Sequence, residues 1–173
     1  MRTILIWSTS DISHVRMSNL LAGLEGKSVK VIDLTIPVWK AEQNKAILGV
    51  LTIFLRMFHL LFAYIILAFR YLFAPKHDMV LVPYMGQIDL LVVKPLAWLR
   101  RKPVVWDVYI SLYDTFVFDR KSISKSNPIA KLIYYLEWLD FKLADIVIAD
   151  TEPHARYMKV LFRLKQEPSV VHI

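Results

Sequence analysis

The stretch Pro103–Tyr109, PVVWDVY, shows the pattern that recurs along the whole chain: a short β-branched and aromatic run that leads into polar side chains. Runs of the same kind lie at Arg2–Trp7, Val29–Leu34, Met79–Tyr84, Asp145–Thr151 and Ser169–Ile173. They are continuous rather than alternating, as is typical of parallel strands buried on both faces. Because helical stretches separate them, the sequence predicts an α/β fold with a Rossmann-like, doubly wound parallel sheet of about six strands.

Helix-start signals fit this order of elements. Ser10 or Asp11 can cap a helix that buries Ile12 and Val15. Asn127-Pro128 is a cap followed by proline at the first helical position, and Thr151-Glu152-Pro153 repeats the device. No repeat or linker divides the chain, so we expect one domain over residues 1–173.

Composition narrows the class of protein. The chain has no cysteine, which excludes disulfides, thiolate zinc sites and cysteine nucleophiles. The net charge is +7 and 56% of the residues are hydrophobic, which suits an anionic membrane or a phosphorylated substrate. No zinc-finger spacing or aromatic-basic RNA-binding signature is present, and we expect no nucleic acid partner. The N-terminus lacks the pattern of a signal peptide, so a cytoplasmic location is expected.

Several cofactor and catalytic motifs are missing. Glycine is scarce, and neither G-x-G-x-x-G nor a Walker A motif occurs. There is also no G-x-S-x-G or H-E-x-x-H motif, and the five histidines are scattered. We therefore expect no bound cofactor and no metal site.

The apolar segment 45–73 resembles a membrane span, but its charges argue against one. Only residues 57–69 lie between Arg56 and Arg70, whereas a spanning helix needs about 20 apolar residues. On one continuous helix, Lys45, Arg56, His59 and Arg70 fall in a narrow basic stripe beside a broad apolar face. We expect this segment to lie in a membrane interface, giving peripheral attachment to the inner face of the membrane. The alternative is a helix pair that packs on the sheet with its stripe in water.

Polar side chains gather where the strands end, which is where open α/β sheets bind ligands. Asp107 follows the strand in PVVWDVY, and residues 107–120 (DVYISLYDTFVFDR) carry carboxylates, hydroxyls and an arginine. An acid, a hydroxyl-binding set and a phosphate-binding arginine are what sugar transfer to a lipid-phosphate acceptor needs. The alternative is that these groups cap helices and bind one another.

A family resemblance rests on four segments. They are PYMGQxD at 83–89, KPVVWD at 102–107, SLYDTFVFDR at 111–120 and LADIVIADT at 143–151 with His154 nearby. Together with Ser13, Arg16 and Asn19 near the N-terminus, they resemble the N-terminal domains of glycosyltransferase family 4.

The resemblance implies one half-domain of a GT-B glycosyltransferase, the half that holds the acceptor, without a metal. The nucleotide-sugar donor is then a co-substrate, bound mainly by a C-terminal domain or subunit that this sequence lacks. Asp107 becomes the candidate catalytic base or orienting acid. The candidate acceptor-binding residues are Ser10, Arg16, Gly86, Gln87, Ser111, Tyr113, Asp114, Thr115, Asp119, Arg120 and His154. The S-T-S-D loop after the first strand departs from the glycine pair of many relatives, and Asp107 stands where many have histidine.

Two functions follow as hypotheses. In the first, the chain is the acceptor domain of a hexosyltransferase that acts on a membrane or lipid-linked glycan in polysaccharide biosynthesis, inactive as an isolated half. In the second, it is a non-catalytic subunit that anchors or recruits a donor-binding partner at the membrane. The chain ends inside an apolar strand, which fits a fragment, a split enzyme or a short protein with a closing strand.

Overall fold

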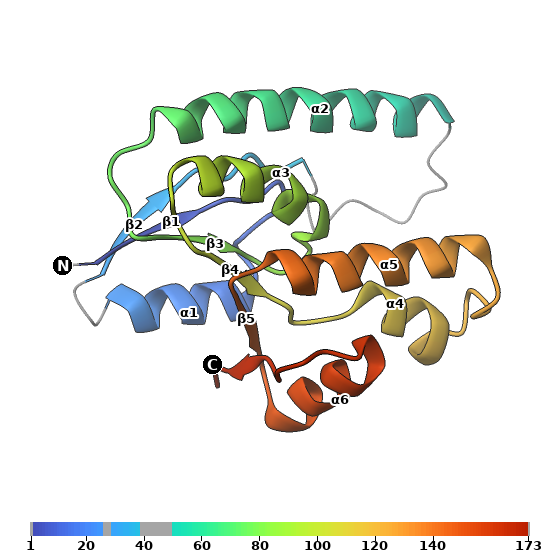
Figure 1. The fold of residues 1–173 in the computed structure, drawn as a ribbon. Helices are drawn as coiled ribbons and strands as arrows, with labels where there is room; N and C mark the ends of the chain where they lie inside the picture. The colour runs from blue at the N-terminus through green and yellow to red at the C-terminus, as the bar shows by residue number, and fades with distance from the viewer. Residues whose placement is uncertain (1, 26–28, 39–49, 173) are drawn as a thin grey trace.

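A six-stranded parallel sheet forms the centre of the computed structural model, which describes residues 2–25, 29–38 and 50–172 (Figure 1). The strands are β1 Thr3–Ile6, β2 Lys30–Asp33, β3 Met79–Val82, β4 Val104–Asp107, β5 Ile146–Ala149 and β6 Ser169–Val170. The helices are α1 Val15–Glu25, α2 Val50–Leu72, α3 Gln87–Leu99, α4 Leu112–Asp114, α5 Pro128–Leu143 and α6 Glu152–Phe162, with a π-helical turn η1 at Thr115–Asp119. The predicted Rossmann-like α/β sheet is confirmed.

The strand order is β2-β1-β3-β4-β5-β6, and every pair is parallel. The order reverses direction at β1, which pairs with β2 on one side and with β3 on the other. Ligands of such sheets bind outside the carboxyl ends of the strands. The strand order therefore directs attention to the loops that follow β1, β3, β4 and β5.

Helices cover both faces of the sheet, which explains why the strand sequences are continuously apolar. Ile4 and Ile6 of β1 pack towards Met17 of α1, whereas Leu5 and Trp7 point to the opposite face. That opposite face is covered by α2, α3 and α5, with Met158 and Phe162 of α6 joining the same core. Since successive side chains alternate between two covered faces, no position in the strand centres is left for a polar residue.

Of the three helix starts expected from the sequence, one has its predicted cap and two differ. The Asn127 side chain accepts a hydrogen bond from the Ile129 backbone N–H at 2.8 Å and caps α5. The first helix begins at Val15, later than expected, because the Asp11 carboxylate accepts from the Ser13 N–H in a turn instead. Thr151 precedes α6 but its side chain makes no capping hydrogen bond.

The helix α2 is continuous over Val50–Leu72 and runs along the outside of the helical layer (Figure 1). Residues 55–72 are long and apolar enough to cross a membrane, and only 22% of this stretch is buried. However, the strands before and after α2 both pair with β1, so the chain leaves and returns to the same sheet. In the predicted basic stripe, His59 and Arg70 are exposed, Arg56 is half-buried, and Lys45 lies outside the described residues.

Candidate functional site

A cleft of about 370 Å³ opens at the carboxyl ends of β4, β5 and β6 beside α1. Its lining comes from four segments of the chain: Val15, Arg16, Asn19, Tyr109, Asp150, Thr151 and His172. The position is that of ligand sites in open parallel sheets. A cation, a carboxylate, a hydroxyl, an amide and an aromatic ring thus converge on one concavity, as they do in sites that orient a polar ligand.

Arg16 forms the floor of the cleft through an ion pair with Asp107. Its Nε and Nη2 donate to the two carboxylate oxygens at 2.9 and 2.7 Å, in a fork-like geometry. The side chains are 8% and 1% exposed. Two roles are predicted for Asp107 from the sequence, a base or an orienting acid. Because the carboxylate is covered by the guanidinium that it orients, the geometry favours the second role.

Three aromatic rings extend from the cleft towards the loop after β3. The Tyr84 and Tyr109 rings meet edge to face at 5.5 Å between centroids, and His14 contacts Tyr84 in the same way at 6.0 Å. The guanidinium of Arg16 lies 5.1 Å from the Tyr109 centroid. Burial raises the pKa of Tyr84, so this phenol stays a neutral hydrogen-bonding group across the physiological range.

Asp150 and His154 form a second polar pair next to the cleft. His154 Nδ1 lies 2.6 Å from Asp150 Oδ1, and the backbone N–H of Thr151 binds the same oxygen. Burial opposes ionisation of Asp150, but the hydrogen bond and charge of His154 outweigh it, and the pKa lies below its ordinary value. An ionised carboxylate therefore holds the imidazole in a fixed orientation, with Nε2 as the nitrogen able to exchange a proton.

Two of the predicted acceptor-binding residues face the interior instead. Gln87 and Ser111 are 3% and 1% exposed, and both donate to the carboxylate of Glu137 on α5. Glu137 also accepts from the backbone N–H groups of Leu112 and Tyr113. This carboxylate ties the starts of α3 and α4 to α5. Gln87 and Ser111 thus have structural partners in this fold, and their role as ligand contacts stays a prediction.

The other predicted residues divide between packing and surface positions. Ser10 is 7% exposed in the tightly folded loop after β1. Gly86 is close-packed, and Thr115 donates to the Ser111 carbonyl at 2.8 Å. Tyr113 packs in an aromatic cluster with Tyr134 and Phe162, and Asp114 accepts a short hydrogen bond from Tyr157. Asp119 and Arg120 are exposed at the end of η1.

The structure thus pairs Arg16 with Asp107 and holds His154 on Asp150, which lines the same cleft, and it adds residues that were not among the predicted site residues. Tyr84 and Tyr109 each stand two positions after the end of a strand, and β3 and β4 are neighbours in the sheet. That equal offset is a signal that could have paired them. Asn19 belongs to the N-terminal segment of the resemblance, but no comparable signal pointed to His172 as a lining residue, because its proximity depends on how the C-terminal strand docks.

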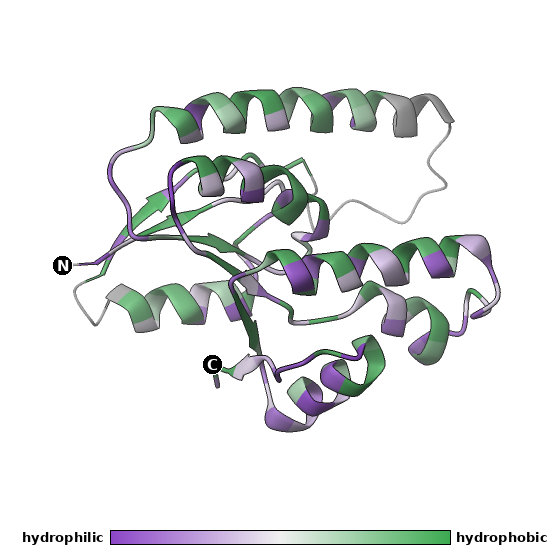
Figure 2. Ribbon diagram, in the orientation of Figure 1, coloured by the Kyte–Doolittle hydropathy of each residue, from purple (hydrophilic) through white to green (hydrophobic). Residues whose placement is uncertain are grey.

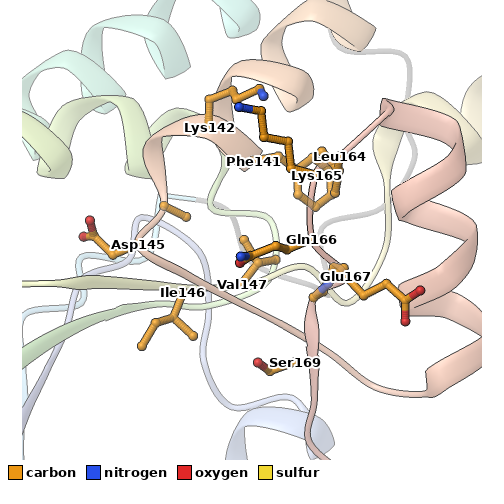
Figure 3. A pocket seen from close by; sticks show the side chains of 12 residues that line it. Phe141, Lys142, Asp145, Ile146, Val147, Leu164, Lys165, Gln166, Glu167 and Ser169 are labelled. Carbon is orange, nitrogen blue, oxygen red and sulfur yellow. The ribbon is translucent and has the colours of Figure 1, made fainter.

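A larger cavity of about 490 Å³ lies at the opposite edge of the sheet (Figure 3). It is formed by the end of α5, the amino end of β5 and the loop between α6 and β6. Lys142 and Lys165 lie close together on one side of it, and the carboxylates of Asp145 and Glu167 lie apart from them. Because it opens at the amino ends of the strands, it is separate from the predicted ligand edge.

Comparison with known proteins gives a limited result. No family model matches the chain, and no curated protein matches it. Among solved structures, the chain is similar to that of Phytolacca americana UGT2 complexed with UDP-2fluoro-glucose and pterostilbene. The TM-score is 0.40 and the identity 14%, over 97% of this chain and 45% of that one. The chain therefore spans less than half of the solved structure it matches.

Proposed function

We propose that the chain is the acceptor-side domain of a glycosyltransferase, which transfers a hexose from a nucleotide-sugar to a membrane or lipid-linked glycan. The proposal rests on the cleft at the carboxyl edge of the sheet and on the resemblance of the chain to glycosyltransferase family 4. A donor-binding domain, in the same chain or in a second one, completes the enzyme.

The charge balance of the cleft is the observation that carries this proposal. Asp107 neutralises Arg16, and Asp150 is ionised beside His154. A cleft whose arginine is neutralised by one carboxylate and which holds a second carboxylate suits the hydroxyl groups of a sugar better than the phosphates of a nucleotide, which require unpaired positive charge. Tyr109 offers an apolar ring face at the same place. The cleft is therefore suited to an acceptor, and the donor phosphates need another surface.

The roles proposed for the residues follow from their positions. Arg16, held by Asp107, and Tyr109 bind and orient the acceptor. His154, oriented by Asp150, takes the proton from the attacking hydroxyl through Nε2. In this scheme Asp107 fixes the arginine and exchanges no proton itself.

The test requires the assembled enzyme, with the donor domain supplied in cis or by the neighbouring gene. Transfer of radiolabelled sugar from a panel of UDP-hexoses and GDP-mannose to a membrane lipid extract is measured. We expect the chain alone to be inactive, Tyr109→Ala to raise the KM for the acceptor, and His154→Gln to lower kcat. Val160→Ala, on the exposed side of α6, is the matched control. Full transfer by both cleft variants would refute these roles.

A non-catalytic role is the second candidate, and the burial of Asp107 is the observation that favours it. The one carboxylate that the resemblance places at the catalytic position is 1% exposed and bound to Arg16. If the chain only recruits a donor-binding subunit to the membrane, the cleft variants leave the transfer rate unchanged, whereas removal of the chain releases the partner from membranes. The two measurements together separate the candidates.

A further inference from the structure

The outer surface of the helical layer is apolar across three helices. On α2 the exposed large side chains are Leu55, Met57, Phe58, Leu61, Phe62, Ile65, Ile66, Phe69 and Leu72. On α3 they are Ile88, Trp98 and Leu99, and on α5 they are Ile129, Leu132, Tyr135, Trp138 and Leu139. Figure 2 shows α2 mostly in the green of hydrophobic residues over its coloured part, with a few purple positions between them. We call this surface the three-helix face.

The α2 helix is apolar on both sides rather than on one. Leu60, Leu67 and Tyr71 are buried against the rest of the fold. At about 100° per residue, Phe62 and Phe69 lie on the opposite side of the helix. They are 55% and 64% exposed. A helix at the surface of a soluble protein presents polar residues there, so the outward side of α2 is built for a non-aqueous neighbour.

The apolar surface continues from α2 to its neighbours. The helix α3 contacts both α2 and α5, and all three cover the same side of the sheet. On α5, Ile129, Leu132 and Tyr135 recur at intervals of three and are each more than half exposed. Trp98, on α3 between the other two helices, is 76% exposed. Contiguous exposed apolar surface of this kind marks an interaction site.

The charges of the three-helix face have one sign. The α2 sequence contains no acidic residue, α3 contains only Asp89, and α5 contains only Glu137 and Asp140. These three carboxylates are 1%, 0% and 0% exposed, so none reaches the outer surface of the described helices. The basic side chains are outside: His59 and Arg70 on α2, and Lys131 and Lys142 on α5, are exposed.

We propose that the three-helix face lies on an anionic lipid bilayer, with α2 in the plane of the interface. Apolar side chains bordered by cations, without exposed carboxylates, match the acyl and headgroup layers of such a membrane. A protein partner would meet a surface without exposed carboxylates to pair with its own basic side chains. A spanning orientation is excluded, since α2 is held at both ends by strands of one sheet.

This orientation places the candidate site relative to the lipid. The helical layer lies between the membrane and the sheet, and α1 lies on the far side of the sheet. With helices about 10 Å thick, the carboxyl edge of the sheet stands about 10–15 Å from the interface, and the cleft, which α1 lines, stands farther out. A lipid-linked acceptor then has to project its sugar beyond the headgroups to reach the cleft. Only this last step rests on the proposed function; the membrane contact does not.

The first test is vesicle flotation of the 173-residue chain without any donor domain. The probes are vesicles of phosphatidylcholine alone and of phosphatidylcholine mixed with phosphatidylglycerol, at low and high salt. We expect preferential binding to the anionic vesicles. High salt should weaken this binding without abolishing it, because the buried apolar contribution is not screened.

Single substitutions locate the contact. Phe69→Glu on α2, Trp98→Glu on α3 and Leu132→Glu on α5 are each expected to weaken vesicle binding about ten- to hundredfold, the equivalent of losing one buried large side chain. Val160→Glu on α6 is the matched control, because Val160 is 77% exposed outside the three-helix face. Circular dichroism confirms that each variant is folded.

Lipid quenching gives a readout that needs no charge introduced into the face. Brominated lipids should quench the fluorescence of the wild-type chain, and Trp98→Phe and Trp138→Phe should each remove part of the quenching, because these two tryptophans lie on the face whereas Trp7 and Trp106 are buried in the core. Three results would overturn the proposal: a folded chain that ignores anionic vesicles, unchanged binding by all three glutamate variants, or a dimer that the same variants dissociate without any vesicle binding. Failure of sugar transfer alone would affect only the proposed function.

Discussion

Replacing Asp107 by asparagine tests whether this carboxylate serves the fold or the chemistry. In the structure it receives hydrogen bonds from Arg16 at 2.7, 2.9 and 3.2 Å, and both side chains are almost completely buried. Asparagine keeps one acceptor oxygen but removes the negative charge. The guanidinium of Arg16 is then left buried without a counter-charge.

The magnitude follows from the burial of the pair. Removing one partner of a buried ion pair costs about 3–5 kcal/mol, because the remaining charge is uncompensated. Asp107→Asn should therefore lower the free energy of unfolding by about 3 kcal/mol, the lower end, since one hydrogen bond survives. Arg16→Gln should cost at least as much. The double variant should cost about 2 kcal/mol less than the sum of the two.

Urea unfolding followed by circular dichroism at neutral pH measures these values, with the slope on urea checked for constancy. Glu152→Gln is the control, because its pair with Arg156 is 66% exposed on both sides and should contribute less than about 1 kcal/mol. An Asp107→Asn chain as stable as the wild type, in an assembled enzyme that has lost sugar transfer, would refute the structural reasoning. It would restore Asp107 as a group that acts on substrate.

Three further predictions concern residues beneath the site. Burial and the charge of Glu137 raise the pKa of Asp140 from 3.8 to about 8, so the stability that its protonated form contributes is complete below pH 3.8 and is lost as pH rises to about 8. The free energy of unfolding of Asp140→Asn should equal that of the wild type below pH 3.8 and exceed it by up to about 6 kcal/mol at pH 8. Curves of unfolding free energy against pH that run parallel for the two proteins would contradict this. Gly86→Ala should destabilise the fold by about 1–3 kcal/mol, because the added methyl would lie 2.3 Å from the Val82 side chain and 2.6 Å from the Pro83 carbonyl oxygen. Gly23→Ala is the control: it has open space in α1 and should stabilise the fold by up to about 1 kcal/mol. Thermal melts measure both. Ser111→Ala removes a hydrogen-bond donor to Glu137 and should lower the free energy of unfolding by about 1–3 kcal/mol. A melting temperature equal to that of the wild type would show instead that water replaces the hydroxyl.

The sheet was predictable because its signal is local. Each strand is a short apolar run whose two faces are both covered. Ile4, Leu5 and Ile6 are therefore all apolar, although they point to different faces of the sheet. The helix that follows Asn127-Pro128 was predictable for the same reason. The start of α1 was not, because Asp11 can make either a cap or a turn, and the choice depends on what α1 packs against.

The site was less predictable because its polar groups find partners far along the chain. Asp107 meets Arg16 across 91 positions, and Gln87 meets Glu137 across 50. Glu137 stands on an amphipathic helix that carries a second acid, Asp140, and nothing in the local sequence distinguishes Glu137 as the hydrogen-bond partner of Gln87 and Ser111. Sequence position placed these residues at the correct edge of the sheet, but only the packed structure shows which of them point outward.

The pairing of β1 with both β2 and β3 also has a consequence for biosynthesis. On one edge, β1 can pair with β2 once residues 30–33 have been synthesised. On its other edge, β1 stays unpaired until β3, residues 79–82, has been synthesised. At translation rates of about 5–20 residues per second, the nascent chain spends about 4–15 s with that edge open. During this interval the most apolar helix has been synthesised before the strand that completes its support. The order of synthesis thus favours early capture of α2 by a chaperone or a bilayer, before the sheet closes.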